Sequence, residues 1–113
     1  MKKVKLYVSG PYTKGDQFIN TRNAILASDE LMEAGVVAFC PHLSAYWNTL
    51  KPHTWQEWMD YDLVWVEACD ALLRLPGESK GADIEVDKAK ELGLPVFYSI
   101  EEAIKWAQEK EKR

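Results

Sequence analysis

Two acidic residues lie at positions of predicted helices where an apolar side chain is expected. The first is Glu85, in a helix predicted to begin at Ser79. At about 100° per residue, Glu85 falls on the apolar arc of that helix, which is formed by Ala82, Val86, Ala89 and Leu92. A carboxylate there loses its hydration and needs either a hydrogen-bonding partner or a chemical role. The structural alternative is a buried glutamate satisfied by backbone groups or by Arg74.

The second acidic residue is Asp62, in a helix predicted to begin at Thr54 with Glu57 completing a capping box. Asp62 lies in mid-helix, so it is neither a helix cap nor a surface residue. It falls on a broad apolar arc formed by Trp55, Trp58, Met59, Leu63, Trp65 and Val66. The structural alternative is a buried aspartate paired with a histidine or with a backbone amide.

Two carboxylates in one closed site suit chemistry at the anomeric carbon of a sugar. One attacks or stabilises the oxocarbenium-like centre, while the other orients it or carries a proton. The competing use is a divalent metal site with Asp62, Glu85 and His42 as ligands. The chain lacks a compact ligand motif such as HExxH or paired cysteines, so neither a metal nor a cofactor is expected.

The elements that must position these residues alternate along the chain. Strands are predicted at residues 4–9, 36–40, 71–74 and 95–98, and helices at 17–34 and from 54, 79 and 99 onward. Near-continuous apolar strands joined by helices predict a parallel sheet of four to five strands covered on both faces. This is a three-layer, Rossmann-like (flavodoxin-like) α/β fold, and right-handed crossovers favour the strand order 2-1-3-4.

Three details of this pattern can be checked separately. The helix at 17–34 carries Phe18, Ile25 and Met32 on one face and stops at Gly35. Residues 41–53, rich in Pro, His, Ser and Asn, are predicted to form a loop. The last helix is expected to open at Ser99 with a second capping box and to fray in the charged tail EKEKR.

The strand order also predicts where a ligand binds. The switch point falls between the first and third strands, and ligands of open α/β sheets bind beyond the carboxyl ends of strands at that point. The turns after these two strands are rich in Gly and Pro, and the residues expected at the crevice are Ser9, Gly10, Pro11, Tyr12, Gly77 and Ser79. Ser79 opens a helix, whose N-terminus suits an anion, although its commonest role in such a turn is an N-cap.

Composition bounds the remaining possibilities. The 113 residues, 47% hydrophobic and with five tryptophans, are expected to form one globular domain over residues 1–113. The net charge of −4 carries no basic footprint, so a nucleic-acid polymer is not an expected partner. No apolar run reaches the length of a membrane span and no signal peptide is visible, which predicts a cytoplasmic protein without a membrane partner. Cys40 and Cys69 are expected to be reduced core residues.

Three segments resemble the nucleoside 2-deoxyribosyltransferase superfamily: LYVSGPY at the first strand, DLVWVEACDALL leading into the third, and SKGADIE opening the next helix. Within it the sequence is most similar to the 2′-deoxynucleoside 5′-monophosphate N-glycosidases and their small bacterial and phage relatives. The resemblance covers most of the chain to about Tyr98. Its most specific part is the linked set of Asp62, Asp70, Ser79 and Glu85.

The resemblance implies a role for several residues. In the family, the glutamate at the position of Glu85 is the nucleophile that forms a glycosyl-enzyme intermediate, and the aspartate at the position of Asp62 supports it. The serine at the position of Ser79 contacts the 5′-phosphate. His42 matches a histidine near the base-binding end of the pocket, and Gly81, within the SKG segment, is counted with the substrate-binding residues.

The resemblance also has gaps. An active-site tyrosine early in the first helix of the N-glycosidases is Asn20 here, so the sugar or phosphate contacts are expected to differ, and Tyr12 is a candidate substitute. Trp47 and Tyr46 are candidates to stack on a base, with loop packing as the alternative. Other loop residues are expected to be solvated or structural: Lys14, Arg22 and His53.

Together these features predict an N-glycosidase that hydrolyses the base–sugar bond of a nucleoside 5′-monophosphate, with a small nucleoside or nucleotide as its binding partner. The alternatives are a nucleoside 2-deoxyribosyltransferase and a non-catalytic nucleotide-binding or sensing module. The tryptophan-rich helix over residues 54–68 carries more apolar surface than one sheet face covers, Trp58 and Trp65 in particular. The resembling proteins are multimeric, so a homodimer or a higher homo-oligomer is expected.

Overall fold

The computed structural model describes residues 3–112 and contains one four-stranded parallel sheet in the order β2-β1-β3-β4. The strands are β1 (Lys5–Ser9), β2 (Val37–Phe39), β3 (Ala71–Arg74) and β4 (Val96–Phe97). Parallel neighbouring strands require crossover connections. The helices of the chain are α1 (Gln17–Glu33), α2 (Ser44–Leu50), α3 (Trp55–Ala68), α4 (Lys80–Glu91) and α5 (Ile100–Glu111). The predicted Rossmann-like α/β class and strand order are confirmed.

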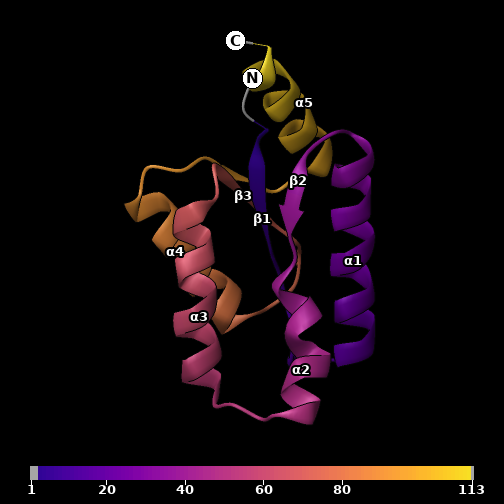
Figure 1. The fold of residues 1–113 in the computed structure, drawn as a ribbon, viewed down its shortest axis with the longest axis vertical. Coiled ribbons are helices and arrows are strands. Elements are labelled where there is room, and N and C mark those ends of the chain that lie inside the picture. Colours follow the sequence, from indigo (N-terminus) through magenta and orange to yellow (C-terminus); the bar gives the residue numbers. More distant parts are fainter. Residues whose placement is uncertain (1–2, 113) are drawn as a thin grey trace.

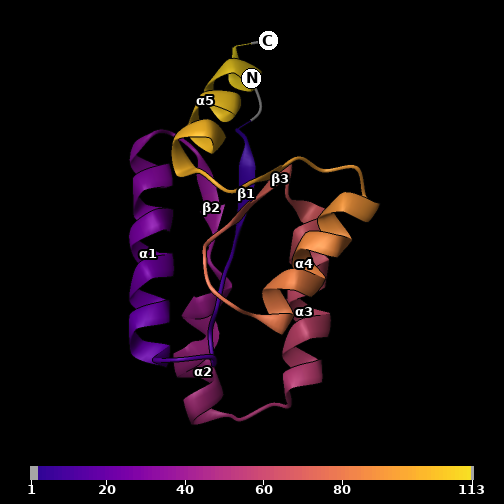
Figure 2. The same ribbon diagram turned by 180° about the vertical axis from the view of Figure 1, so that it is seen from behind.

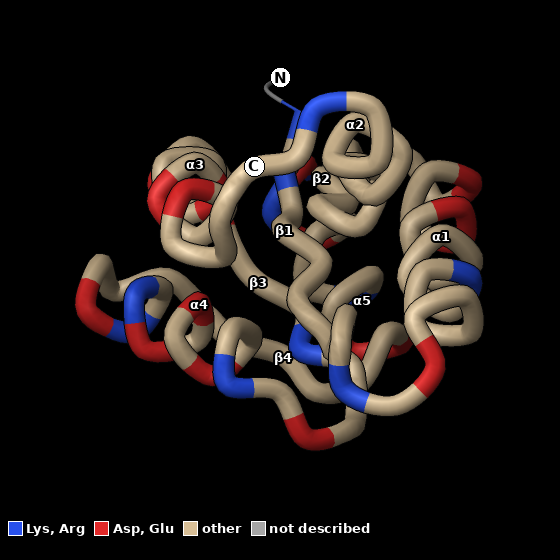
Figure 3. Tube along the Cα trace, turned by 90° about the horizontal axis from the view of Figure 1, so that it is seen from below, with Lys and Arg blue, Asp and Glu red and all other residues tan. Residues whose placement is uncertain are grey.

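Helices cover the sheet on both faces, with α1 and α5 on one side and α3 and α4 on the other (Figures 1 and 2). Side chains alternate along a strand, so β1 contributes to both cores. Leu6 and Val8 pack with α1 and α5, whereas Tyr7 packs with α3 and α4. Ser9 contacts α4 through a hydrogen bond. The view from below shows the same three layers (Figure 3).

Most predicted helix ends are found where the sequence places them. Thr54 and Glu57 form the reciprocal capping box of α3, and Ser79 caps α4 by accepting from the amide of Ala82. Gly35, with φ +88°, follows the end of α1. At α5, within the described chain, Ser99 accepts from the amide of Glu102, but Glu102 does not return the bond. The second capping box is therefore only half formed, and α5 remains helical to Glu111 rather than fraying earlier.

The prediction of a loop at residues 41–53 is wrong. A 3-10 turn at Pro41–Leu43 leads directly into α2. The α2 segment contains no Gly or Pro, yet a helix this short is marginal in isolation. It packs on α3: the rings of Trp47 and Trp58 meet edge to face at 5.1 Å, and the Trp58 indole donates to Asn48 Oδ1 at 2.7 Å. Tertiary contacts therefore stabilise a helix that the local composition does not indicate.

The apolar face of α1 lies on the outside of the molecule. Ala24 and Leu31 form its buried face, whereas Phe18 is 79% exposed, Ile25 41% and Met32 73%. Leu31 belongs to the core on this side of the sheet, and Ala24 is fully buried. A similar difference occurs at the end of α4, where Ala82, Val86 and Ala89 are buried as predicted but Leu92 is half-exposed because it is the C-cap residue.

Two tryptophans of α3 make aromatic contacts within the chain. Trp58 is partly buried against α2, and Trp65 stacks on Phe39 with ring centroids 4.8 Å apart. Trp65 is still 40% exposed and Trp55 47%, so the expectation of an oligomer stays a prediction. The two cysteines, Cys40 and Cys69, are free and buried as predicted, and burial raises the pKa of the Cys69 thiol to about 11. Over residues 3–112, no helix combines the length and the apolar character needed to cross a bilayer.

Candidate active site

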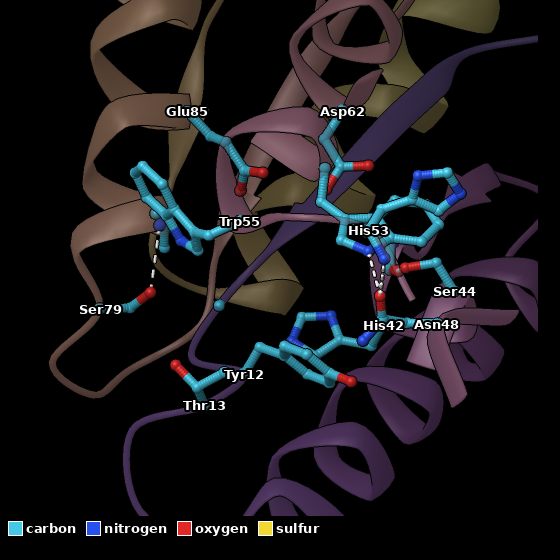
Figure 4. Close-up of a pocket in the computed structure, with 15 residues that line it drawn as sticks. Tyr12, Thr13, His42, Ser44, Asn48, His53, Trp55, Asp62, Ser79 and Glu85 are labelled. Atoms are coloured by element: carbon cyan, nitrogen blue, oxygen red, sulfur yellow. Dashed lines mark hydrogen bonds between the residues drawn. The ribbon is translucent and has the colours of Figure 1, made fainter. Parts of the chain in front are cut away.

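A cavity of about 240 Å³ opens at the carboxyl ends of β1 and β3, which is where the strand order predicts a ligand. The turn after β1, the segment after β2, and helices α3 and α4 supply its walls. Figure 4 shows their side chains converging on one space. The lining residues are Gly10, Tyr12, Thr13, Pro41, His42, Ser44, Asn48, His53, Trp55, Trp58, Asp62, Ser79, Gly81, Ala82 and Glu85.

Glu85 is 5% exposed, and each of its carboxylate oxygens accepts a hydrogen bond from a hydroxyl of β1. The Tyr7 hydroxyl donates to Oε2 at 2.6 Å and the Ser9 hydroxyl donates to Oε1 at 2.7 Å. Tyr7 and Ser9 are two residues apart on one strand, so both point to the face covered by α4. Burial raises the pKa of Glu85, and the two hydroxyl donors and the charge of Arg74 oppose that rise.

The alternative partner considered for Glu85, Arg74, is engaged elsewhere. Its guanidinium forms an ion pair with Asp83, with Nη2 3.0 Å from Oδ1, and also donates to the carbonyl of Gly77 at 2.9 Å. Arg74 therefore acts on Glu85 only through its charge. The two hydroxyls of β1 are the groups that hold the carboxylate in place.

Asp62 faces the same cavity from the middle of α3, and Figure 4 shows both carboxylates directed into one space. Burial, followed by the negative charge of Glu85, raises the pKa of Asp62 to about 7. Two nearby carboxyl groups in different environments lose their protons at different pH values. Near neutral pH Asp62 is therefore divided between its protonated and ionised forms, which is the condition suited to proton transfer.

His42 is a neutral group at the opposite wall. Its Nε2 lies 2.8 Å from the carbonyl oxygen of Pro11, which identifies Nε2 as the donor and Nδ1 as an acceptor. Burial lowers the pKa of His42, which keeps the ring uncharged. Nδ1 is buried and, among the described residues, has no hydrogen-bond partner. A buried acceptor of this kind is usually matched by a water or a ligand.

The N-terminus of α4 forms the other end of the cavity. The Ser79 hydroxyl accepts from the amide of Ala82 at 3.1 Å, and Lys80 places its ammonium 5.4 Å from the ring centroid of Trp55. Gly81 allows close packing here, because a Cβ at this position would lie 3.3 Å from the sulfur of Met59. A second hollow of about 390 Å³ adjoins the cavity and shares Tyr12, Thr13, Trp55, Ser79 and Gly81 with it.

Two of the predicted substrate-binding residues act in the turn after β1 instead of in the cavity. The side-chain amide of Asn20 donates to the carbonyls of Tyr12 and Lys14, at 3.0 and 2.8 Å. Pro11 presents its carbonyl to His42. Neither Asn20 nor Pro11 lines the cavity. The side-chain amide of Asn20 and the carbonyl of Pro11 instead hold the loop that lines it.

Two further predicted residues also lie outside the lining. Ser9 is fully buried behind Glu85. Gly77 has φ +117°, and a Cβ there would lie 2.7 Å from Pro11 Cγ, so this glycine is required by the packing of one turn against another. By contrast, the cavity does contain Gly10, Tyr12, His42, Ser79 and Gly81 together with the two acids.

Asp70 lies at the other end of the sheet. Its carboxylate accepts from the amide of Lys5 at 2.8 Å, next to the amino ends of β1 and β3. Its place in the family resemblance therefore reflects the fold rather than the cavity. Tyr46 and Trp47 do not line the cavity either, and Lys14 forms an exposed ion pair with Glu78.

Several lining residues carry no signal that sequence analysis recognised. His53 is exposed, as expected, but it also lines the cavity and meets the ring of Trp58 edge to face at 5.5 Å. Asn48 enters because residues 44–50 are helical. Tyr7 holds Glu85 without lining the cavity, and it could have been found, since strand alternation places it on the same side as Ser9. Over residues 3–112, no three His, Cys, Asp or Glu side chains are grouped so that they could hold a metal ion.

Residues 4–98 match the family described as "Domain of unknown function (DUF4406)". The search of curated proteins returns no match. Among solved structures, the chain is similar to a 2-deoxyribosyltransferase from the psychrotolerant bacterium Bacillus psychrosaccharolyticus, with a TM-score of 0.59 and 21% identity. The similarity covers 82% of this chain and 69% of that chain.

That transferase is described as a biocatalyst for the synthesis of antiviral and antitumoral nucleosides. At 21% identity, the likeness establishes the fold. It confirms the fold implied by the resemblance of LYVSGPY and the two later segments to deoxyribosyltransferases. The chain therefore belongs to the DUF4406 family and has the α/β fold of a 2-deoxyribosyltransferase.

Proposed function

We propose that this protein is an N-glycosidase that hydrolyses the base–sugar bond of a deoxynucleoside 5′-monophosphate. One observation carries the proposal: a buried glutamate held by two hydroxyl donors faces, in one cavity, an aspartate whose pKa is raised to about 7. A pair of carboxyl groups with different environments can divide nucleophilic attack and proton transfer between them.

In the first step, ionised Glu85 attacks the anomeric carbon of the sugar. The carbon–nitrogen bond to the base breaks, and its electron pair leaves with the base nitrogen. Protonated Asp62 donates its proton to the departing base, so the base leaves in its neutral form. The hydroxyls of Tyr7 and Ser9 fix the direction of Glu85, which is the positional control that nucleophilic catalysis needs.

In the second step, water resolves the glycosyl ester on Glu85. Asp62, now ionised, takes a proton from the water while the water oxygen bonds to the anomeric carbon. The bond between that carbon and the Glu85 oxygen breaks and returns the carboxylate. The products are a free base and deoxyribose 5-phosphate, and Asp62 is again protonated.

The features around α4 support a phosphorylated substrate. The helix N-terminus offers unpaired backbone N–H groups and the positive end of the helix dipole. Ser79 and Gly81 line both the cavity and the adjoining hollow, and Lys80 lies beside them. The cavity of about 240 Å³ is below the range of roughly 300–1,000 Å³ usual for ligand sites, so the hollow supplies the additional room for a phosphate.

The opposite wall supports binding of the base. Trp58 offers an aromatic edge or face to a heterocycle, and the uncharged ring of His42 lies on the same wall. Asn48 already accepts from the Trp58 indole and from the amide of His53, so its amide N–H groups remain for a ligand.

Two alternatives remain. A nucleoside 2-deoxyribosyltransferase would retain the same first step but hold a second base in place of water, and the similarity to such a transferase is the observation that favours it. A non-catalytic nucleotide-binding module is disfavoured because binding alone gains nothing from desolvating two acidic groups.

One experiment separates these functions. The protein is incubated with a deoxynucleotide, the corresponding unphosphorylated nucleoside and an isotopically labelled second base. We expect free base and deoxyribose 5-phosphate from the nucleotide and no label in any nucleoside. Label in a new nucleoside without free sugar identifies a transferase. Unchanged substrates, with a deoxynucleotide still bound in calorimetry, identify a binding module.

A further inference from the structure

The outward face of α1 carries a regular stripe of residues that the cavity does not use. The spacing between successive members alternates between four and three residues, so they lie one above another on one side of the helix. We refer to this set as the outer stripe, and it consists of Phe18, Arg22, Ile25, Asp29 and Met32. Figures 1 and 3 show α1 along the outer edge of the molecule, with the sheet and α5 on its inner side.

The outer stripe reverses the usual distribution of side chains on a surface helix. Such a helix normally presents its large apolar groups to the core and its charges to water. In α1 the inner face contains Ala24 and Leu31, while three large apolar side chains of the stripe are exposed. Ile19 and Leu26 lie beside the stripe and are also about half exposed. Large apolar side chains exposed together on one face of a helix are typical of an interaction site.

We propose that the outer stripe is a homodimer interface in which the α1 helices of two copies pack antiparallel about Ile25. This inference is independent of the proposed function. A two-fold axis makes every contact occur twice. If residue i of one copy contacts residue j of the second copy, then residue j of the first copy contacts residue i of the second. With Ile25 on the axis, Phe18 faces Met32 of the second copy, and Arg22 faces Asp29 of the second copy. The pattern is therefore complementary to itself.

The two charges select the antiparallel arrangement and the partner. If the helices packed parallel and in register, Arg22 would meet Arg22 and Asp29 would meet Asp29, and like charges in contact are unfavourable. Antiparallel packing forms the opposite-charge pair twice. Within the described residues neither side chain has an ion-pair partner, and Arg22 makes only a 3.3 Å hydrogen bond to the adjacent Asn23. Both charges are thus available to the second copy.

A groove beside the stripe accommodates the largest of these side chains. It has a volume of about 520 Å³, lies between α1 and the edge strand β2, and includes Met32, Val37 and Leu43 in its walls. In the antiparallel arrangement Phe18 of the second copy reaches the Met32 end of the helix, where this groove lies. The outer stripe and the groove contain no residue that lines the catalytic cavity, so dimerisation leaves that cavity open.

The test is a charge-reversal cycle followed by sedimentation velocity at micromolar concentration and low salt. The unmodified protein should sediment as a species of twice the 13.0 kDa chain mass. Arg22→Asp and Asp29→Arg should each yield monomer, with a dimer dissociation constant raised at least about 100-fold, because each substitution creates two like-charge contacts. The double variant carrying both changes should restore the dimer. Lys105→Glu, on the exposed side of α5, is the matched control and should remain dimeric.

Each result decides the proposal, provided that circular dichroism shows all variants to be folded. A monomeric unmodified protein overturns it, and the outer stripe then faces another protein. A dimer that survives both single reversals overturns it in favour of a different face. Single reversals that dissociate the dimer without rescue in the double variant reject the antiparallel pairing of Arg22 with Asp29.

Discussion

The Tyr7 hydroxyl donates a 2.6 Å hydrogen bond to Oε2 of Glu85, joining the central strand of the sheet to the carboxylate at the centre of the cavity. Both residues are buried, so little solvent can replace this bond. Burial and the charge of Glu85 raise the pKa of Tyr7, which keeps the phenol protonated as a donor. The bond therefore orients Glu85 and stabilises its ionised form.

Tyr7→Phe should shift the pH dependence of activity. Removing the donor takes away one of the groups that lower the pKa of Glu85, so that pKa rises. The nucleophile must be ionised, so the acid limb of the kcat/KM profile should move to higher pH. Unfolding free energy should fall by about 1–3 kcal/mol, because a buried acceptor loses its partner. Tyr98→Phe is the control, since Tyr98 is exposed. An unmoved acid limb would contradict this role of Tyr7.

Glu85→Gln should abolish turnover while leaving the fold and nucleotide binding largely intact. The amide keeps the shape of the side chain but cannot form the glycosyl ester. Turnover is measured as base release, and binding by calorimetry with a deoxynucleotide. Glu91→Gln, at an exposed position of the same helix, should behave like the parent. Turnover of the Glu85 variant within about tenfold of the parent would rule out the nucleophile.

Asp62→Asn should reduce kcat by about 10²- to 10⁴-fold, the usual effect of losing a positioned acid–base group. The parent should lose activity as pH rises through the pKa of Asp62, about 7, because the proton needed by the leaving base is then absent. The residual activity of the variant should lack that limb. Asp60→Asn is the matched control, because Asp60 is exposed and bonds only Gln56 among the described residues.

Asp62→Asn should also change the stability of the fold in a pH-dependent way. The pKa of Asp62 is raised from 3.8 to about 7 on folding, so between these values the folded state binds a proton that the unfolded state has lost. Stability from this group is therefore present below about pH 4 and declines as pH rises through 7. Asp62→Asn should raise Tm above pH 7 and have little effect near pH 4. Equal changes of Tm at both pH values would be inconsistent with this linkage.

Ser79→Ala should separate the cap of α4 from the binding of a phosphate. Loss of the N-cap should cost about 0.5–2 kcal/mol of stability, and Ser99→Ala should cost a similar amount at α5. Only the Ser79 variant should raise KM for a deoxynucleoside monophosphate, because Ser79 lines the cavity. Chemical denaturation and initial rates measure the two effects. Similar KM values for both variants would limit Ser79 to its capping role.

Local patterns predicted the strands, most helix starts and the inward positions of Glu85 and Asp62, and the preference for right-handed crossovers then predicted the sheet order. These features depend on spacing along the chain, since a helix repeats every 3.6 residues and a strand every two. Parallel strands also place their carboxyl ends at one edge of the sheet, so the location of the cavity follows from the strand order. A single sequence contains all of this information.

Tertiary structure alone decided what each group contacts. The partners of Glu85 are Tyr7 and Ser9 rather than Arg74, because the crossing of α4 over β1 sets which side chains meet. Asn20 holds a turn rather than lining the cavity, since loop geometry directs its amide to nearby carbonyls. The apolar stripe of α1 points outward while Ala24 and Leu31 form the buried face, and periodicity does not determine which of two helix faces a sheet will cover.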